Sequence, residues 1–120
     1  MKRNDPLPLF IVGGTNGGGA SLDSTEALDL SNYHYSCNAT EPFNSNVESA
    51  VSFLSNGIPV VCGGLVGDNN NKEISDVCYK YPEEGDLLWF PLTTMTKRRR
   101  WAAGVQLDED RFWVTGRFIV

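Results

Sequence analysis

Three cysteines are the residues of this 120-residue chain whose spacing best suits covalent chemistry. Cys62 ends one short apolar run, and Cys78 lies in the next run, beyond the polar segment 65–74. If these runs are neighbouring antiparallel strands, their cysteines can come close enough to form a disulfide. The alternative is two buried free thiols, because cysteine is among the most buried residue types. Cys37 is the odd cysteine, which is either free or paired outside this chain.

A second candidate for covalent modification is the triplet Asn38-Ala39-Thr40, which matches the acceptor pattern for N-linked glycosylation. A chain this rich in asparagine, serine and threonine is expected to contain such a triplet by chance. The triplet therefore indicates secretion only in combination with a disulfide between Cys62 and Cys78. From these two features together we expect an extracellular protein, and the alternative is the cytosol, where thiols usually stay reduced.

For enzymatic chemistry the sequence offers little. His34 is the single histidine, so a site that needs two imidazoles cannot be built from this chain. The acidic runs 83–84 and 108–110 fall in predicted turns, where charge is ordinarily solvated. The glycines at 17–19 follow a predicted strand but precede neither a helix nor a Lys-Ser/Thr pair, so they form a turn and not a phosphate-binding loop. We therefore expect no catalytic residue, no metal ligand and no cofactor.

Composition argues against several classes of function. The formal net charge is −5 at pH 7, which disfavours nucleic-acid binding because that function usually requires a basic face. No apolar run reaches the roughly 18 residues that a membrane-spanning helix needs. The apolar run 7–12 is also too short for the centre of a signal peptide. We expect no targeting segment in this chain, which fits either a cytosolic protein or a piece of a longer one.

A repeat of about fifty residues organises the chain. The segment Phe10-Ile11-Val12-Gly13-Gly14 resembles Val60-Val61-Cys62-Gly63-Gly64, and Gly13 precedes Gly63 by 50 residues. Gly116 follows Gly63 by 53 residues, after the apolar run 112–114. Upstream of the glycines, residues 50–54 align with residues 103–107, so that Leu54 and Leu107 hold equivalent positions in the two copies. The repeat predicts one structural unit that recurs along the chain.

Each unit is predicted to contain four short strands. In the complete copy they lie near 49–54, 58–63, 75–81 and 87–92, and turn residues such as Asn56-Gly57 separate them. Helical periodicity is absent, which indicates an all-β fold. A period near fifty with four strands per copy is typical of a propeller blade. We expect the paired glycines at the strand ends to permit close approach of neighbouring segments, whereas Gly67 should tolerate alanine unless its φ is positive.

The complete copy resembles a kelch repeat, which is the blade of one family of β-propellers. The resemblance covers nearly the whole chain, but two copies depart from the pattern: Leu28 stands where the family prefers tyrosine, and Arg117 replaces the second glycine of the third copy. Leu92 and Met95 also match the complete motif. The residues that carry the motif in the three copies are Gly13, Gly14, Gly63, Gly64, Tyr81, Trp89, Arg98 and Gly116.

The resemblance implies a partial β-propeller of about two to two-and-a-half kelch blades, each of four antiparallel strands. Residues 1–46 would form a partial blade, 47–98 a complete blade and 99–120 the first strands of a third, all within one incomplete propeller domain. Tyr81 and Trp89 would pack between blades. In invertebrate kelch-type proteins, Cys-Gly-Gly followed by a cysteine in the third strand recurs, which favours the disulfide between Cys62 and Cys78.

For function, the resemblance implies a non-catalytic module that binds a protein partner through its loops. Loops that join the second and third strands emerge on one face of a propeller, here 15–24 and 65–75, and binding often resides in such loops. The alternative is part of a galactose-oxidase-like enzyme whose catalytic residues lie outside this chain. The remaining blades would come from the same chain or from self-association. The possible binding residues in the second loop are Asp68, Asn69, Asn70, Asn71 and Lys72.

Overall fold

The computed structural model describes residues 9–28, 37–68 and 70–118, and of residues 117 and 118 only the backbone. In these ranges every regular element is a β-strand, and no helix occurs that could span a membrane. The all-β prediction is confirmed. The strands are β1 Leu9–Val12, β2 Thr25–Leu28, β3 Cys37–Ala39, β4 Val47–Glu48, β5 Val51–Ser55, β6 Ile58–Cys62, β7 Leu65–Val66, β8 Glu73–Ile74, β9 Val77–Lys80, β10 Phe90–Thr94, β11 Arg99–Asp108 and β12 Arg111–Phe118.

The central element is a four-stranded antiparallel sheet in the order β10-β9-β6-β5. Its strands lie close to the four that the sequence predicts for the complete copy. β5 and β6 are joined by a tight turn at Asn56-Gly57, where both residues have positive φ, 54° and 78°. This conformation is the one that an Asn-Gly pair favours in a two-residue hairpin. The local turn chemistry therefore sets the register of the first two strands.

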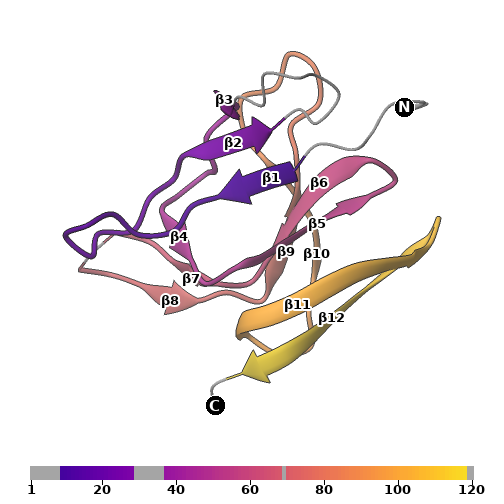
Figure 1. Cartoon of the computed structure of the whole chain (residues 1–120). Coiled ribbons are helices and arrows are strands. Elements are labelled where there is room, and N and C mark those ends of the chain that lie inside the picture. Colours follow the sequence, from indigo (N-terminus) through magenta and orange to yellow (C-terminus); the bar gives the residue numbers. More distant parts are fainter. Residues whose placement is uncertain (1–8, 29–36, 69, 119–120) are drawn as a thin grey trace.

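Three layers stack on one another (Figure 1). The first layer is the sheet β1-β2-β3, the second is the central sheet, and the third is the long hairpin β11-β12. A small side sheet, β4-β7-β8, lies beside the first two layers. All pairs in the described sheets are antiparallel.

The first and second layers enclose one apolar core around Trp89, which is 1% exposed. The Trp89 ring lies 5.8 Å from that of Phe10 in β1, 5.3 Å from Phe43 and 5.2 Å from Tyr81, measured between ring centroids. Val61 of β6 points into the same core. Tilted and edge-on aromatic contacts at these distances are favourable beyond the area they bury. Tyr81 and Trp89 thus lie between the first two layers.

The second and third layers enclose the other core. Val60 and Cys62 of β6 alternate with Val61, so they face the opposite side of the central sheet. Phe53 packs on Phe112 of the hairpin with ring centroids 5.1 Å apart. Because both faces of β6 are covered, its sequence is a continuous apolar run instead of an alternating one.

The repeat recurs in the backbone hydrogen bonds. In the first copy, Gly14 donates its N–H to the carbonyl of Val47 (2.8 Å), Val47 donates to Leu22 (2.9 Å), and Leu22 donates back to Gly14 (2.9 Å). We call this closed set of three bonds the backbone cycle. The second copy contains the same cycle, from Gly64 to Arg99 (2.8 Å), from Arg99 to Ser75 (3.2 Å) and from Ser75 to Gly64 (2.9 Å). Each cycle ties the pair of glycines after β1 or β6 to a residue at or just before the start of the following layer.

The alignment of 50–54 with 103–107 is wrong by one residue in the structure. Cys62 and Thr115 are equivalent, because each precedes the aligned glycine of its copy. Val51 pairs with Cys62 and Ala103 pairs with Thr115, so Ala103 is equivalent to Val51 and not to Ala50. The pairing of β11 with β12 shifts between Gln106 and Asp108, which accommodates one extra residue in β11. The corrected register also aligns Ser49 with Trp101, and both have positive φ, 61° and 54°.

Candidate functional site

The two loops expected to carry binding are joined to one short strand, β4. Val47 of β4 forms an antiparallel bridge with Leu22 of the first loop and pairs with Val66 of the second. Val66 in turn pairs with Glu73 in β8. This lateral series of pairs brings both loops to the same side of the layers (Figure 1). The exposed part of loops 15–24 and 65–75 is called the loop face.

The first loop is held by its own side chain Asn16. The Asn16 Oδ1 atom accepts hydrogen bonds from the backbone N–H groups of Gly18 (2.9 Å) and Ala20 (3.1 Å). Thr15 and Ser21 form a bridge at the base of the loop. The interpretation of the glycine run 17–19 as a turn is confirmed. Asparagine at this position replaces a backbone partner, which is its usual role in turns.

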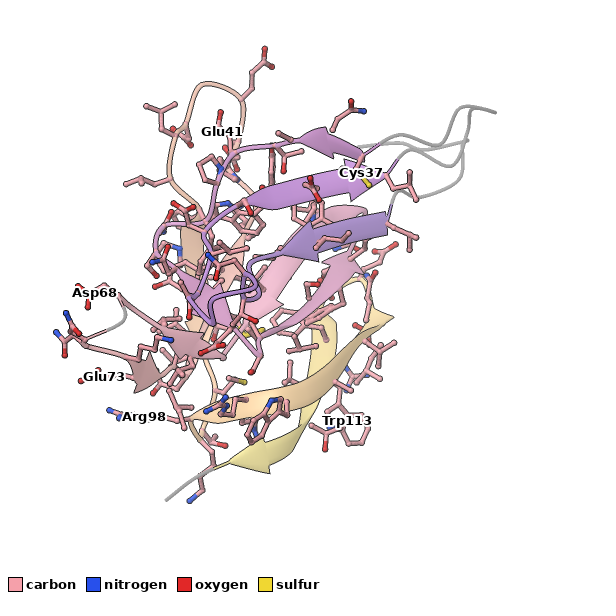
Figure 2. The ribbon with its side chains drawn as sticks, turned by 60° about the vertical axis from the view of Figure 1, so that its left-hand side comes forward. Cys37, Glu41, Asp68, Glu73, Arg98 and Trp113 are labelled. Carbon is pink, nitrogen blue, oxygen red and sulfur yellow. A yellow bond between two sulfur atoms is a disulfide. The ribbon has the colours of Figure 1, made fainter. Side chains whose placement is uncertain are left out.

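The tip of the second loop is exposed and polar. Asp68 Oδ1 accepts a hydrogen bond from the Asn70 N–H (3.1 Å), and the Asp68 carbonyl accepts one from the Asn71 N–H (3.1 Å). Asp68, Asn70 and Asn71 are exposed, and Figure 2 shows Asp68 and Glu73 pointing away from the layers. Asn69, the remaining asparagine proposed for binding, lies outside the described residues.

Lys72 anchors the second loop. Its Nζ lies 3.2 Å from Glu48 Oε1 in β4, and the side chains of Lys72 and Glu48 are only 20% and 18% exposed. A partly buried ion pair in this position ties the loop to the neighbouring strand. The structure therefore places Lys72 at the base of the loop face and not at its tip.

Gly67 also belongs to the anchored base. Its φ is +118°, and a Cβ on residue 67 would overlap the carbonyl oxygen of Asn71. Its N–H donates to the carbonyl of Asn46 at 3.0 Å. We expected alanine to be tolerated here unless the φ of Gly67 is positive; it is positive, so this exception applies and Gly67→Ala should be costly. Short glycine loops of this kind require the left-handed region at one position, and the sequence does not say which.

Arg98, the last residue of the complete kelch-like motif, is exposed. Figure 2 shows it on the same side of the molecule as Asp68 and Glu73.

The aromatic motif residues are buried more deeply: the hydroxyl of Tyr81 accepts a hydrogen bond from the N–H of Glu41 (3.3 Å), and Trp89 Nε1 donates to the Glu41 carbonyl (3.3 Å). Tyr81 and Trp89 therefore hold the segment after β3 against the central sheet.

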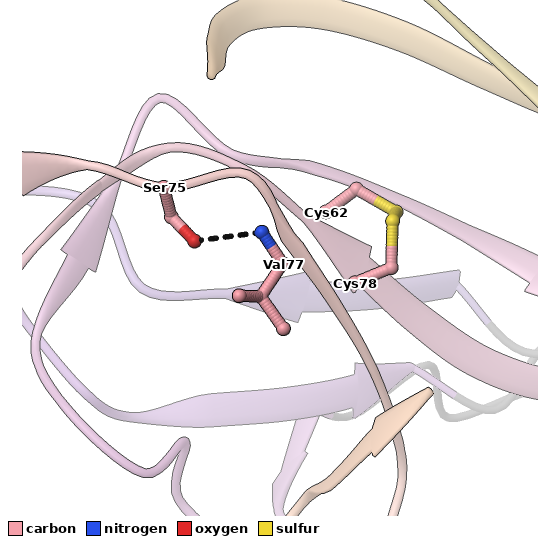
Figure 3. The surroundings of a disulfide bond; sticks show 4 residues. All are labelled: Cys62, Ser75, Val77 and Cys78. Carbon is pink, nitrogen blue, oxygen red and sulfur yellow. Dashed lines mark hydrogen bonds between the residues drawn. A yellow bond between two sulfur atoms is a disulfide. The ribbon is translucent and has the colours of Figure 1, made fainter. Parts of the chain in front are cut away.

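A disulfide joins Cys62 and Cys78, which is the alternative that the spacing allows and the resemblance favours (Figure 3). The two residues lie directly opposite each other in β6 and β9, with Cα atoms 4.0 Å apart. Both are buried in the second core, at 1% and 0% exposed. Beside them, the Val77 N–H donates to Ser75 Oγ at 3.0 Å, which orders the start of β9. The structure leaves Cys37 as a free, exposed thiol in β3 next to the exposed Asn38.

Among the described residues, no group of three His, Cys, Asp or Glu side chains could hold a metal ion. His34 lies outside the described ranges. A groove of about 740 Å³ lies between β10 and β12, with Met95 and Phe112 in its lining. It marks the part of the central sheet that the two-stranded third layer does not cover.

The chain matches no protein-family model, and no curated protein is similar to it in sequence.

Proposed function

We propose that the three layers are successive kelch-type blades of a β-propeller: a partial first blade, a complete second blade and the first two strands of a third. The recurrence of the backbone cycle supports this proposal, because equivalent residues make equivalent bonds about fifty residues apart. Stacking of each layer on the next through apolar faces supports it as well.

We further propose that this module is a non-catalytic scaffold that binds a protein partner through its loop face. The observation that carries the proposal is the attachment of both loops to β4, through the bridge Leu22–Val47 and the pair Val47–Val66. Loops that are held in place lose less conformational entropy on binding than free loops do. The exposed amides and carboxylates at the tip would bind hydrogen-bond donors and basic groups on the partner.

The experiment that tests this function compares two sets of alanine substitutions. Asn70→Ala with Asn71→Ala alters the tip of the loop face, where both side chains are exposed to solvent. Glu84→Ala with Asp86→Ala is the control, because both residues are exposed in the turn between β9 and β10, at the other end of the strands. A partner is identified by affinity capture, and its affinity for each variant is then measured with purified components.

The proposal is supported if a purified partner binds the control variant as tightly as the unaltered protein and binds the loop variant at least tenfold more weakly. Equal binding of both variants would place the interface elsewhere. Folding of each variant is checked by circular dichroism, so that loss of binding is not confused with loss of structure.

We also propose that the protein is extracellular. The disulfide between Cys62 and Cys78 fits an oxidising compartment. Intact-mass measurement of native protein without reductant tests this location. The expected result is one disulfide and a glycan on Asn38, whereas alkylation of all three cysteines with an unmodified Asn38 would indicate the cytosol.

A further inference from the structure

Each layer has two faces that differ in what they contact. We define the front face of a layer as the one that packs on the following layer, and the back face as the one that packs on the preceding layer. In the second layer the strand β6 is buried on both faces: Val60 on the front is 1% exposed, and Val61 on the back is 1% exposed.

The front face of the third layer is apolar and open. Trp113 and Val105, a directly opposed pair in β12 and β11, occupy the positions that Val60 and Phe53 have in the second layer. Trp113 is 59% exposed and Val105 57% exposed, and Figure 2 shows Trp113 projecting from the hairpin. The strand residues around them enclose a shallow depression of about 320 Å³, lined by Ala103, Gly104, Val105, Trp113 and Thr115.

The back face of the first layer is open in the same way. Ile11 of β1 has the position that Val61 has in the second layer, since both precede the first glycine of their copy by two residues. Ile11 is 50% exposed, and its neighbour on this face, Leu9, is 56% exposed. Large apolar side chains gathered on one side of a sheet usually mark an interaction surface.

We propose that a second copy of this chain docks head to tail, with the back face of its first layer on the front face of the third layer. The reason lies in the two contacts already within the chain, each of which places a front face on the back face of the next layer. Among the described residues, one front face and one back face are left uncovered. The proposed contact continues that stacking with residues of the same kind in the same register, and it does not depend on what the loop face binds.

Such a contact is heterologous, because different surfaces of the two copies meet. Copies joined in this way form a closed ring or an open chain, and each copy needs both faces to extend the assembly. If the front face is blocked in one copy and the back face in the other, the two copies can still bind each other, but the assembly cannot grow beyond a dimer. This property distinguishes head-to-tail docking from a symmetric dimer.

The test uses three single substitutions of exposed apolar residues by glutamate. Val105→Glu alters the front face, and Ile11→Glu alters the back face. Leu88→Glu is the matched control, because Leu88 is 68% exposed and belongs to neither face. Molar mass is measured by size-exclusion chromatography with light scattering over a range of protein concentrations. Using glutamate on both faces prevents the altered faces from attracting each other.

The expected result is that the unaltered protein and Leu88→Glu assemble in multiples of the 13.2 kDa chain. Val105→Glu and Ile11→Glu each remain monomeric alone, and an equimolar mixture of the two forms a dimer. Recovery of the dimer on mixing also shows that both variants are folded. The proposal is overturned if the unaltered protein is monomeric at all concentrations, or if Ile11→Glu assembles alone as well as the control does.

Discussion

Gly63 lies so close to Arg99 that a Cβ on residue 63 would overlap the Arg99 carbonyl oxygen. The same relationship joins Gly13 to the Val47 carbonyl in the first copy. In both copies this glycine directly precedes the glycine that takes part in the backbone cycle. Its φ is positive, 70° at Gly63 and 64° at Gly13. Glycine is needed at these positions for two separate reasons, the backbone conformation and the space.

Substitution of Gly63 by alanine should destabilise the fold more than substitution of Gly85 does. Gly85 has a φ of +91°, but a methyl group on residue 85 would meet no atom of the described residues within 4 Å. Gly85→Ala therefore adds only the cost of a left-handed alanine, about 1–2 kcal/mol. Gly63→Ala adds the overlap with backbone, so its loss should be larger by about 1–3 kcal/mol. Urea unfolding measures both free energies. Equal losses would mean that Gly63 and Arg99 are not in close contact.

Trp89→Ala should lower the free energy of unfolding by about 3–5 kcal/mol, because it opens a cavity between the first two layers. Trp113→Ala is the matched control, since Trp113 is 59% exposed, and an exposed substitution of this kind should change stability by less than about 0.5 kcal/mol. Unfolding is followed in urea at low protein concentration. If both variants lose the same stability, Trp89 does not hold the layers together.

Removal of the disulfide should lower the free energy of unfolding by about 3 kcal/mol, the value expected for a closed loop of about 15 residues. The variant carries Cys62→Ala and Cys78→Ala, whose sequence separation is 16. Cys37→Ala is the control, because this exposed thiol is free in the structure. Thiol titration of the unaltered protein under oxidising conditions should detect only Cys37. Detection of all three thiols would contradict the disulfide.

Asp108 should titrate below the ordinary range of an aspartate. The side chain of Arg111, with its Nη2 2.7 Å from Asp108 Oδ2, lowers the pKa of the Asp108 carboxyl, and the N–H of Asp110 lowers it further. A lowered pKa in the folded protein means that the stabilising contribution is present above the unfolded pKa and is lost as pH falls through the folded pKa. The side chain is exposed, so the contribution is small and screened by salt.

Carbon-detected NMR titration of the Asp108 carboxyl measures this effect. Arg111→Gln should return the titration midpoint toward the ordinary value, whereas Lys80→Gln, which breaks the separate ion pair with Glu83, should leave it unchanged. A midpoint for Asp108 that does not respond to Arg111→Gln would show that the ion pair does not form in solution.

The sequence predicted the strands of the central sheet within a few residues, because apolar and β-branched runs separated by turn residues are local signals. It also indicated that Gly63 lies in a crowded place. It could not identify Arg99 and Val47 as the neighbours, since the contact is with a backbone carbonyl that any residue supplies. The extra residue in β11 was missed because matching the two copies at one fixed spacing assumes equal strand lengths, whereas a bulge adds one residue to one copy.

The candidate site was predicted in part. Topology located both loops, but the strand that joins them, β4, is only two residues long and pairs with Val66 far along the chain. Pairs of that kind depend on the tertiary structure and leave no periodic pattern in the sequence. The burial of Lys72 against Glu48 and the positive φ of Gly67 follow from the same pairing.

The backbone cycle also has a consequence for engineering. It closes the base of each loop by a bond between Leu22 and Gly14 in one copy and between Ser75 and Gly64 in the other, although the second loop is longer. The packing of the layers therefore depends on the hydrogen bond that closes the base of the loop and not on the number of residues in the loop. If Leu65–Val66 and Glu73–Ile74 are kept, foreign peptide grafted between Asp68 and Asn71 should be displayed without altering the stacking beneath.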